Sequence, residues 1–494
     1  MSLIEIEKQR ETILASAKLD GAFYNIIGGK RLATTRHLSV INPATGKALA
    51  TVPDIDAATL DDAVDAARKA FPGWRALPLA RRKQALSEVL IEIARHAEEL
   101  IVLLTAEQGR PLSMARWEID LLTNHYGPGF LKMDLPQIEQ HIAGIGLVIK
   151  RHTPRGVVGA ITPWNVPVLL SFVKAFPAML AGNTVILKPS PFTPLTVLRI
   201  ADYTRELLPP GVLNTVTGGD ELGPWMTSHS GIDHITFTGS TATGKRVLAS
   251  ASGTLKHVGL ELGGNDPGIV LADADPHAIA RDLFNSMFLL SGQGCICLKR
   301  LYIDEDIYPA VTEALVSIAR SAKVGNGLDP DTALGPIQNQ LQYQRLQSSW
   351  EEIKKSGAKI LYRGDVPENE TGFFFPVTLL DNPPEDASFV VQENFGPIRS
   401  VFKYKTVDEA IRRANNTSYG LGASVWGKRS NELQRVAGQL EAGTVWINQH
   451  LVRNPFVPAA AYKNSGIGVE LGEEGLKEFC NIQVIAAKQE IRNG

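Results

Sequence analysis

Short apolar runs bounded by glycine, proline or polar residues recur along the first half of the chain, at 156–162, 184–188, 213–217 and 234–238. Stretches with helical spacing separate these runs. Short buried strands that alternate with helices are typical of a parallel sheet covered by helices on both faces. The pattern therefore predicts an α/β domain with a doubly wound sheet.

A second strand–helix series begins at about residue 266 and continues through 300–303, 401–404 and 423–426. We interpret it as a second α/β domain, because a chain of 494 residues is too long for one hydrophobic core. Two strand-like segments fit neither series, and they could pair with each other or with another subunit; they are 146–152 and 480–488.

Two further apolar segments bear on helices and membranes. The apolar positions of 86–104 recur every three or four residues, which predicts one amphipathic helix that ends near Gly109 and Pro111. The most apolar stretch, 166–182, is interrupted by Lys174 and Pro177 and falls short of a membrane span. The first residues contain no apolar signal-peptide core. We therefore expect no membrane contact and a cytoplasmic location.

Charge and cysteine content narrow the class of protein. The formal net charge is −2, and basic and acidic residues are mixed along the chain, so we expect no nucleic-acid partner. The three cysteines are Cys295, Cys297 and Cys480. An odd, small number argues against a disulfide framework and fits a reducing compartment.

Cys295 stands in a glycine-punctuated turn, Ser291-Gly-Gln-Gly-Cys-Ile-Cys. A thiolate there could gain from nearby backbone N–H groups, which lower a thiol pKa and can hold an oxyanion. The residue could equally be a small buried apolar side chain, or form a redox pair with Cys297. A Cys-x-Cys pair supplies only two soft metal ligands, and no second Cys/His cluster has zinc spacing, so we expect no metal site.

Two other polar side chains are placed where a thiol nucleophile would need help. Glu261 lies in an apolar strand-like segment before a double glycine, so burial would raise its pKa and suit it to act as a general base. Asn165 follows the strand at 156–162, where α/β sheets bind ligands, and its amide could stabilise an oxyanion. Taken alone, Glu261 could instead pair with a Lys or Arg, and Asn165 could cap its own loop.

The segment from His234 passes from a strand through Gly239 into a helix, and such a helix N-terminus suits a pyrophosphate. It matches the nucleotide P-loop loosely, but Arg246 stands where a P-loop has the Ser or Thr that holds Mg²⁺. The Rossmann pattern Gly-x-Gly-x-x-Gly is absent from the sequence. A dinucleotide would therefore bind in a variant way.

With these residues assembled, the chain resembles the aldehyde dehydrogenase superfamily, in its NAD(P)-dependent, hydrolytic form, from about Tyr24 to the C-terminal tail. Seven motifs stand in the family's order: Pro163-Trp-Asn-Val-Pro, Leu187-Lys-Pro-Ser, Phe237-Thr-Gly-Ser-Thr, Leu260-Glu-Leu-Gly-Gly, Gly292-Gln-Gly-Cys, Glu393-Asn-Phe-Gly-Pro and Tyr462-Lys-Asn-Ser-Gly. Each is weak to moderate alone, but together they favour this family over the separate alternatives above.

The resemblance implies a role for each matched residue. Cys295 attacks the aldehyde, Asn165 and the Cys295 N–H hold the oxyanion, and Glu261 activates the water that hydrolyses the thioester. Lys174 and Glu470 match positions that relay protons and steady the base. The residues implied to bind NAD or NADP are Ile161, Thr162, Pro163, Trp164, Lys188, Ser190, Gly223, Phe237, Thr238, Gly239, Ser240, Leu262, Gly263, Glu393 and Phe395.

The resemblance also implies a domain plan. Residues 1–128 and 153–259 would form a Rossmann-like NAD(P)-binding domain, and 260–458 the catalytic domain. Residues 129–152 and 459–494 would form a small β oligomerisation element, so we expect a homodimer or homotetramer.

Two departures from the family pattern affect specificity. Many NAD-preferring members have a glutamate after Lys-Pro-Ser, which binds the adenosine ribose; here Pro191 stands there, so we expect NADP to be tolerated. Many relatives also have Pro-Phe-Gly-Gly before the Tyr-Lys-x-Ser-Gly motif, whereas this chain has Pro458-Ala-Ala-Ala. If the apolar residues near this segment and the cysteine turn line the substrate entrance, the tunnel is hydrophobic and has no obvious carboxylate clamp. We therefore expect an aromatic or medium-chain aldehyde in preference to a charged semialdehyde; the apolar residues are Leu451, Val452, Phe456, Phe288, Leu289 and Leu290.

Three rival functions remain open at this stage. A CoA-acylating dehydrogenase would pass the acyl group to CoA, which would make the base Glu261 superfluous. A non-catalytic binding protein could retain the fold, although Cys295, Glu261 and Asn165 are all intact. A Cys295–Cys297 bond could regulate activity, but one intervening residue makes a strained ring.

Overall fold

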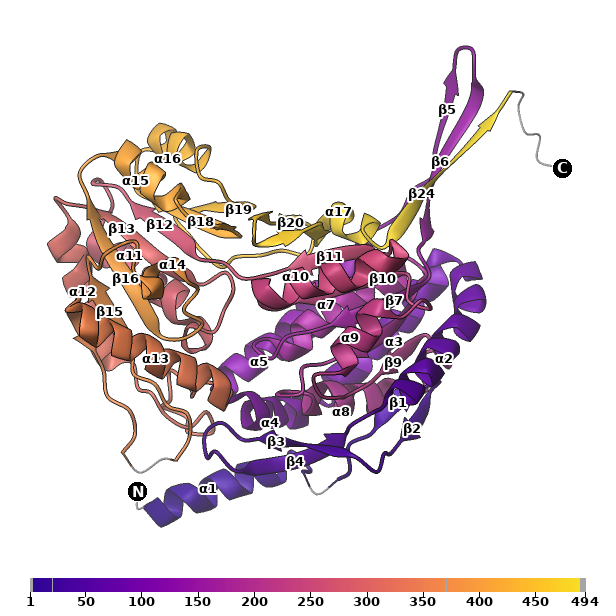
Figure 1. Cartoon of the computed structure of the whole chain (residues 1–494), viewed down its shortest axis with the longest axis horizontal. Helices are drawn as coiled ribbons and strands as arrows, with labels where there is room; N and C mark the ends of the chain where they lie inside the picture. The colour runs from indigo at the N-terminus through magenta and orange to yellow at the C-terminus, as the bar shows by residue number, and fades with distance from the viewer. Residues whose placement is uncertain (1–2, 20, 369–370, 489–494) are drawn as a thin grey trace.

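The computed structural model of the chain describes residues 3–19, 21–368 and 371–488. Two large sheets dominate it and form separate lobes that face each other (Figure 1). In the first sheet the neighbouring strands β9, β8, β7, β10 and β11 run parallel. The strand order is β2 (Lys30–Leu32), β1 (Asn25–Ile27), β9 (Leu213–Thr215), β8 (Thr184–Lys188), β7 (Val157–Ile161), β10 (His234–Thr238), β11 (His257–Glu261) and β22 (Gly466–Ile467).

The second sheet is parallel apart from its edge strand β14. Its order is β14 (Lys359–Arg363), β15 (Thr378–Asp381), β16 (Ile398–Tyr404), β13 (Leu298–Asp304), β12 (Asp266–Val270), β18 (Gly422–Trp426) and β19 (Thr444–Ile447). Both sheets contain the strands that the apolar runs predict, so the expected α/β class with two doubly wound domains is confirmed. The predicted residue boundaries between the domains stay a prediction.

Alternate residues of the central strands enter different cores, which explains their continuous apolar sequence. Val158 and Ala160 of β7 pack in one cluster with α3 and α7, whereas Val157 and Ile161 pack in another with α2 and α10. The helices of this lobe are α2 (Ala57–Ala76), α3 (Leu79–Arg95), α4 (Ala97–Gln108), α5 (Leu112–Asp120), α6 (Gly127–Lys132), α7 (Pro167–Leu180), α8 (Leu195–Thr204), α9 (Leu222–Ser228) and α10 (Thr241–Ala251).

The second sheet has its own helices, and short elements complete the chain. The helices are α11 (Pro276–Phe288), α12 (Tyr308–Ser321), α13 (Gln340–Ser356), α14 (Ser388–Val391), α15 (Val407–Asn415) and α16 (Ser430–Ala437). Further elements are α1 (Leu3–Ala15), α17 (Gly472–Lys477), β3 (His37–Ile41), β4 (Ala48–Pro53), β17 (Tyr419–Gly420), β20 (Ala459–Ala460), β21 (Tyr462–Lys463) and β23 (Val469–Glu470).

The single helix predicted over 86–104 is wrong in one respect, because the structure divides this segment between α3 and α4. His96 links them with φ −102° and ψ 14°, which ends one helix and begins the next. The apolar spacing runs across the break because α4 is buried on nearly every side. The predicted end is correct, since Gly109 follows α4 in the left-handed conformation, with φ 91°.

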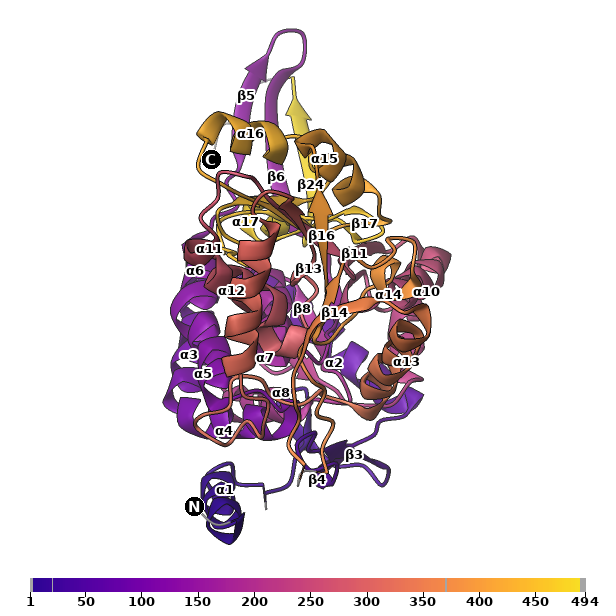
Figure 2. The same ribbon diagram turned by 90° about the vertical axis from the view of Figure 1, so that its left-hand side faces the viewer.

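The strand-like segments 146–152 and 480–488 do pair with each other. Strand β6 (Gly146–Pro154) lies antiparallel to β24 (Cys480–Ala487), and β5 (Ile138–Ile142) completes a three-stranded sheet. This sheet projects away from both lobes (Figures 1 and 2). Ile138, Ile142, Ile482 and Val484 are exposed on it. Its expected role in assembly stays a prediction, and residues 1–2 and 489–494 of the predicted parts lie outside the described residues.

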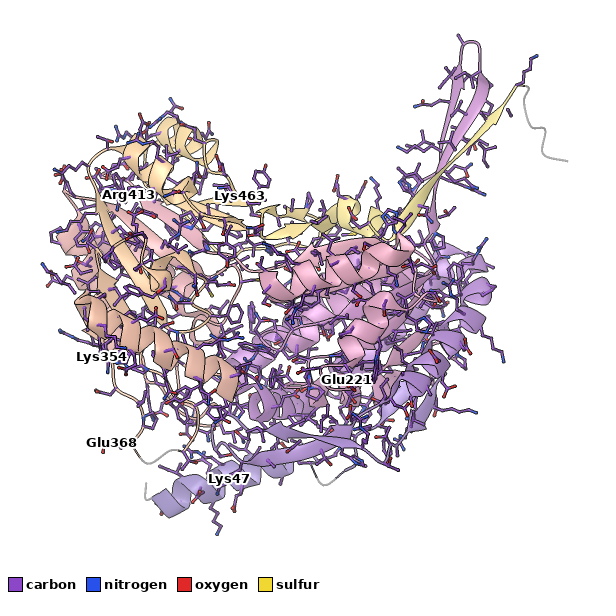
Figure 3. All side chains as sticks on the ribbon, viewed as in Figure 1. Lys47, Glu221, Lys354, Glu368, Arg413 and Lys463 are labelled. Carbon is purple, nitrogen blue, oxygen red and sulfur yellow. The ribbon has the colours of Figure 1, made fainter. Side chains whose placement is uncertain are left out.

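The surface carries charges of both signs on different elements, as the mixed composition predicts. The side chains of Lys47, Glu221 and Lys354 are exposed and lie far apart in the view of Figure 3. Within the described ranges, no helix is both long and apolar enough to cross a membrane.

A buried ion pair between Arg110 and Glu118 fixes the segment that connects β7 to α7. Both side chains are almost fully buried. A Glu118 oxygen also accepts the backbone N–H groups of Val168 and Leu169, at 2.7 and 2.9 Å, in the first turn of α7. Arg110 donates in addition to the backbone carbonyl of Asn165. The pair therefore anchors the loop that carries Asn165.

Replacing Glu118 with glutamine should destabilise the protein, because Arg110 would keep a buried charge without an anion. Breaking a buried ion pair from one side costs about 3–5 kcal/mol. We expect a loss of about 3 kcal/mol in the free energy of unfolding, measured by urea titration.

The matched control is Glu98→Gln, which removes an exposed ion pair with Arg116 in which the Glu98 side chain is 77% exposed. That change should alter the free energy of unfolding by less than about 0.5 kcal/mol. Equal effects of the two substitutions would contradict the anchoring role of Glu118.

Candidate active site

Cys295 lies in a strained turn between α11 and β13. Leu290, Ser291 and Gly292 are all left-handed, with φ values of 53°, 58° and 76°. Such backbone is unfavourable for residues other than glycine, and it persists only where the surroundings enforce it. A Cβ on Gly292 would lie 2.3 Å from the carbonyl oxygen of Gly396. The turn therefore needs glycine at 292, and it brings Cys295 to the edge of a cleft.

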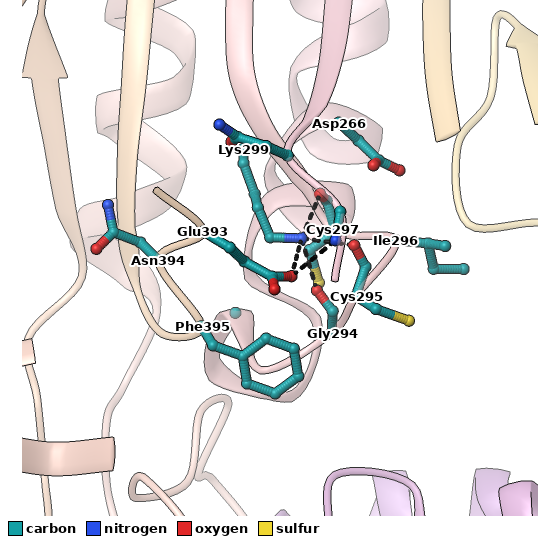
Figure 4. A network of polar contacts seen from close by, with 12 residues as sticks. Asp266, Gly294, Cys295, Ile296, Cys297, Lys299, Glu393, Asn394 and Phe395 are labelled. Atoms are coloured by element: carbon teal, nitrogen blue, oxygen red, sulfur yellow. Dashed lines mark hydrogen bonds and ion pairs between the residues drawn. The ribbon is translucent and has the colours of Figure 1, made fainter. Parts of the chain in front are cut away.

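The Lys299 side chain stabilises this turn through hydrogen bonds to its backbone. Its Nζ donates to the carbonyl oxygens of Gly294, Cys295 and Cys297 at 2.9, 2.6 and 3.4 Å. It also pairs with Glu393 at 3.2 Å, and the Cys295 sulfur points away from the lysine (Figure 4). The role of Lys299 cannot be predicted from the sequence, because nothing in the sequence shows that three carbonyls converge on one lysine.

Burial controls the protonation of the two reactive groups. It raises the pKa of the Cys295 thiol to about 12, while the positive charges of Arg453 and Lys299 act in the opposite direction. It also raises the pKa of Glu261, and the negative charge of Glu470 adds to that rise. At neutral pH the thiol of Cys295 and the carboxyl of Glu261 are therefore mainly protonated, and each must lose a proton before it can react.

Glu261, Lys174 and Glu470 are brought together from three distant segments. Glu261 ends β11, Glu470 ends β23, and Lys174 lies in α7. Lys174 forms an ion pair with Glu470 and donates to the Thr236 hydroxyl at 3.1 Å. The predicted grouping of these three residues is therefore present in the structure.

The Asn165 side chain contacts the cysteine turn directly. Its Nδ2 donates to the backbone carbonyl of Gln293 at 3.0 Å, two residues before Cys295. Asn165 is buried and, with Cys295, lines the cleft. An amide donor thus stands beside the thiol, as an oxyanion site requires.

The cleft between the two lobes has a volume of about 730 Å³, within the range of small-molecule sites. The rings of Trp164 and Phe395 meet edge to face across it, with centroids 5.2 Å apart. The predicted site residues that line it are Pro163, Trp164, Asn165, Thr238, Gly239, Ser240, Leu262, Gly263, Cys295, Glu393 and Phe395.

The other predicted cofactor residues lie behind or beside this cleft. Ile161 and Phe237 pack in the core of the first lobe, Thr162 bonds Ser171, and Gly223 lies in α9. Lys188 and Ser190 are buried at and just after the carboxyl end of β8.

The charge environment of Lys188 is a separate feature of that strand end. Burial lowers the pKa of Lys188 to about 8, and the carboxylate of Asp220 opposes this shift. Asp220 follows β9, so it lies at the same edge of the sheet as Lys188. The sequence analysis did not identify it.

The apolar residues expected to line the substrate entrance divide into three groups. Phe288 and Leu290 are 1% and 5% exposed, and Phe288 packs in the core of the second lobe. The expectation is therefore wrong for Phe288, because α11 turns that face toward its own sheet. Val452 and Phe456 are strongly exposed, at 55% and 51%. Leu289 and Leu451 are half-buried near the cysteine turn and the 450–457 loop, respectively.

Arg453 is a further residue that the sequence analysis did not identify. Burial acts to lower its pKa, but the neighbouring acids Glu261, Cys295 and Glu470 hold that pKa above its ordinary value. The guanidinium therefore lies at the reacting end of the site. In the sequence, the only sign of it is an arginine that interrupts an otherwise apolar segment after His450.

Known proteins that are similar to this chain identify its family. The model of the aldehyde dehydrogenase family matches residues 31–485. Aldehyde dehydrogenase LUC3 from a Fusarium species is 37% identical over 466 residues, which cover 94% of this chain and 98% of that protein. A mutant of aldehyde dehydrogenase C from Pseudomonas syringae, solved with NAD⁺ and octanal, is 33% identical with a TM-score of 0.90 and covers 95% of this chain and 98% of its own. An NADP-dependent enzyme from E. coli is 32% identical with a TM-score of 0.90 and covers 94% and 98%. The chain therefore belongs to the aldehyde dehydrogenase family.

Proposed function

We propose that this enzyme oxidises an aldehyde to its carboxylic acid, with Cys295 as the nucleophile and Glu261 as the hydrolytic base. The observation that carries the proposal is that the Cys295 turn and the Asn165 amide meet in the interlobe cleft, and that the Glu261 carboxyl lies close enough to act on the pKa of the Cys295 thiol. The three groups come from separate segments of the chain: the turn before β13, the loop after β7 and the end of β11.

In the first half-reaction, the Cys295 thiol loses its proton to Glu261 or to water, and its sulfur forms a bond to the aldehyde carbon. The former carbonyl oxygen becomes an oxyanion, which the Asn165 amide and the Cys295 N–H stabilise by hydrogen bonds. To do this, the Asn165 amide exchanges its contact with the Gln293 carbonyl for the oxyanion. Sulfur suits the step because a thiolate both attacks and leaves readily.

The residues of the cleft fit a nicotinamide dinucleotide. The N-terminus of α10, preceded by Gly239 and Ser240, opens into the cleft and suits a pyrophosphate. Lys188 and Ser190 would hold the adenosine ribose, Glu393 the nicotinamide ribose, and Trp164 and Phe395 would pack beside the rings. A bound nicotinamide would supply the acceptor for the hydride that leaves the carbon bonded to Cys295.

In the second half-reaction, water hydrolyses the thioester on Cys295. Glu261 removes a proton from that water as the oxygen attacks the acyl carbon, and the thiolate leaves. Lys174 and Glu470 steady the base and carry its proton outward, since Glu470 lies close enough to act on the Glu261 charge.

A CoA-acylating reaction is the second candidate within the family. It needs no general base for hydrolysis, and the burial of Glu261 next to the thiol therefore favours water as the acceptor. Formation of acyl-CoA, with sustained reduction of the cofactor only when CoA is added, would establish the alternative.

For the substrate, we propose an aldehyde with an apolar aromatic or medium-chain body. Leu289, Ile296 and Leu451 are half-buried around the cysteine turn and the 450–457 loop, where the body of an aldehyde would lie. The Pseudomonas syringae relative was solved with octanal.

Replacing Glu261 with glutamine should separate the two half-reactions, because an amide cannot take the proton from water. We expect a burst of one reduced cofactor per subunit, followed by turnover slowed by about 10²–10⁴. Stopped-flow absorbance with hexanal measures this directly. Cys295→Ala should show no burst, and unchanged steady turnover of the Glu261 variant would contradict its role.

The rate of acid formation should rise with pH, because only the ionised form of Glu261 can act as the base. Burial raises the pKa of Glu261 to about 8. Below that value the ionised fraction falls about tenfold per pH unit, so kcat should climb from about pH 6 and level off above about pH 8. A kcat profile that is already flat from pH 6 would contradict the raised pKa.

Cofactor selectivity should depend on Pro191, which follows Lys188 and Ser190. A carboxylate placed there would repel a 2′-phosphate, so Pro191→Glu should lower kcat/KM for NADP by about tenfold or more. The wild type should use both cofactors. Measured kcat/KM values that favour NAD by about a thousandfold in the wild type would rule out this prediction.

A further inference from the structure

Arg453 is half-buried as a residue, and its hydrogen bonding differs from that of the buried Arg399 and Arg300. Arg399 donates to the carbonyls of Met287, Gly292 and Gly396, and Arg300 to those of Asn265 and Ala414. The Nε and Nη2 of Arg453 are buried but have no hydrogen-bond partner among the described residues. Buried guanidinium N–H groups are nearly always paired, because an unpaired one loses its hydration without compensation.

The unpaired guanidinium lies at the reacting end of the site. Its positive charge acts on the Cys295 thiol and the Glu261 carboxyl. It also acts on Tyr126, in the segment that leads into α6. The 450–457 loop that carries Arg453 packs on α6, since a Cβ on Gly129 would lie 2.4 Å from Pro455. The arginine is therefore fixed beside the reacting groups on a supported loop.

The nearby carboxylates do not supply the missing partner. Glu470 is paired with Lys174, and burial favours the neutral form of Glu261. Neither carboxylate bonds to Nε or Nη2 of Arg453. The Arg453 guanidinium has therefore lost hydration at Nε and Nη2 without gaining an anionic partner, which costs free energy. An anion that binds to these two nitrogens would offset that cost.

The two unpaired nitrogens are the pair that a carboxylate binds best. Nε and Nη2 lie on one side of the planar guanidinium, with parallel N–H bonds that match the two oxygens of a carboxylate. A hydroxyl, a thiol or a neutral carbonyl would fill one of the positions at most.

We propose that Arg453 binds a carboxylate on the substrate, so that the enzyme acts on aldehydes that also carry a carboxylate on an apolar body. This proposal rests on the proposed function, aldehyde oxidation at Cys295, and it adds the substrate class. The semialdehydes of aliphatic dicarboxylic acids and carboxylated aromatic aldehydes belong to this class. The aldehyde end lies at Cys295 and the carboxylate end at Arg453, with the apolar part between them.

The test compares matched aldehydes that differ only in the carboxylate: hexanal with 6-oxohexanoate, and benzaldehyde with 4-formylbenzoate. The measured quantity is the ratio of kcat/KM within each pair. Any influence of Arg453 on Cys295 or Glu261 acts on both members, so the ratio reports the carboxylate contact alone. We expect the wild type to favour the carboxylated member of at least one pair.

Arg453→Met should lower that ratio by about a hundredfold, because a bidentate bond to a charged group is lost. Arg453→Lys keeps the charge but not the paired N–H groups, and it should give an intermediate ratio. Arg281→Met, which removes an exposed arginine on α11, should leave the ratio unchanged.

A binding measurement on the wild type covers the case in which the variants do not fold. Adipate, a dicarboxylate without an aldehyde, should slow alkylation of Cys295 by iodoacetamide, whereas hexan-1-ol at the same concentration should not.

A wild-type ratio at or below one in both pairs, or a ratio unchanged in Arg453→Met, would overturn the proposal. Equal protection by adipate and hexan-1-ol would do the same. Failure of the neutral aldehydes and the carboxylated ones alike to reduce NAD or NADP would instead reject the proposed function itself.

Discussion

The hydrogen bonds from Lys299 to the cysteine turn are the interaction on which the rest of the site depends. One ammonium group binds three carbonyls of a turn that contains left-handed Leu290 and Ser291, and it also pairs with Glu393, which lines the cleft. A strained turn persists only where its surroundings enforce it. Lys299 therefore positions Cys295 and links its turn to the cleft.

The second organising feature is the balance of buried charge around Cys295. Burial favours the neutral thiol and the neutral Glu261 carboxyl, whereas Arg453 and Lys299 favour the thiolate. Lys174 and Glu470 neutralise each other next to this group. The arrangement gives a base that can accept a proton near neutral pH and a cation with unused hydrogen-bond donors. Both features fit chemistry in which an anion forms and disappears during each turnover.

The sequence predicted most of what depends on local pattern. Apolar runs located the strands β7, β8, β10 and β12, and glycines marked the turn that presents Cys295. Glu261 and Asn165 were found because they directly follow or end such strands. These signals suffice because parallel strands end at the same edge of a sheet.

The parts that the sequence did not predict depend on how distant segments face each other. Lys299 and Arg453 look like ordinary cations in the sequence, and their roles come from which carbonyls and acids surround them. Phe288 was misplaced because its neighbour Cys295 lies at the cleft while α11 turns Phe288 into the core. The break at His96 was missed because α4 is buried on nearly all sides and apolar spacing continues through it.

The central claim is that Cys295 carries the acyl group, and peptide mass spectrometry tests it most directly. The Glu261→Gln enzyme is mixed with hexanal and NAD, quenched in acid, and digested. The account predicts the added mass of one hexanoyl group on the peptide that contains Cys295 and Cys297, with fragmentation placing it on Cys295. A hexanoyl group on Cys297, or no adduct although reduced cofactor has formed, would contradict it.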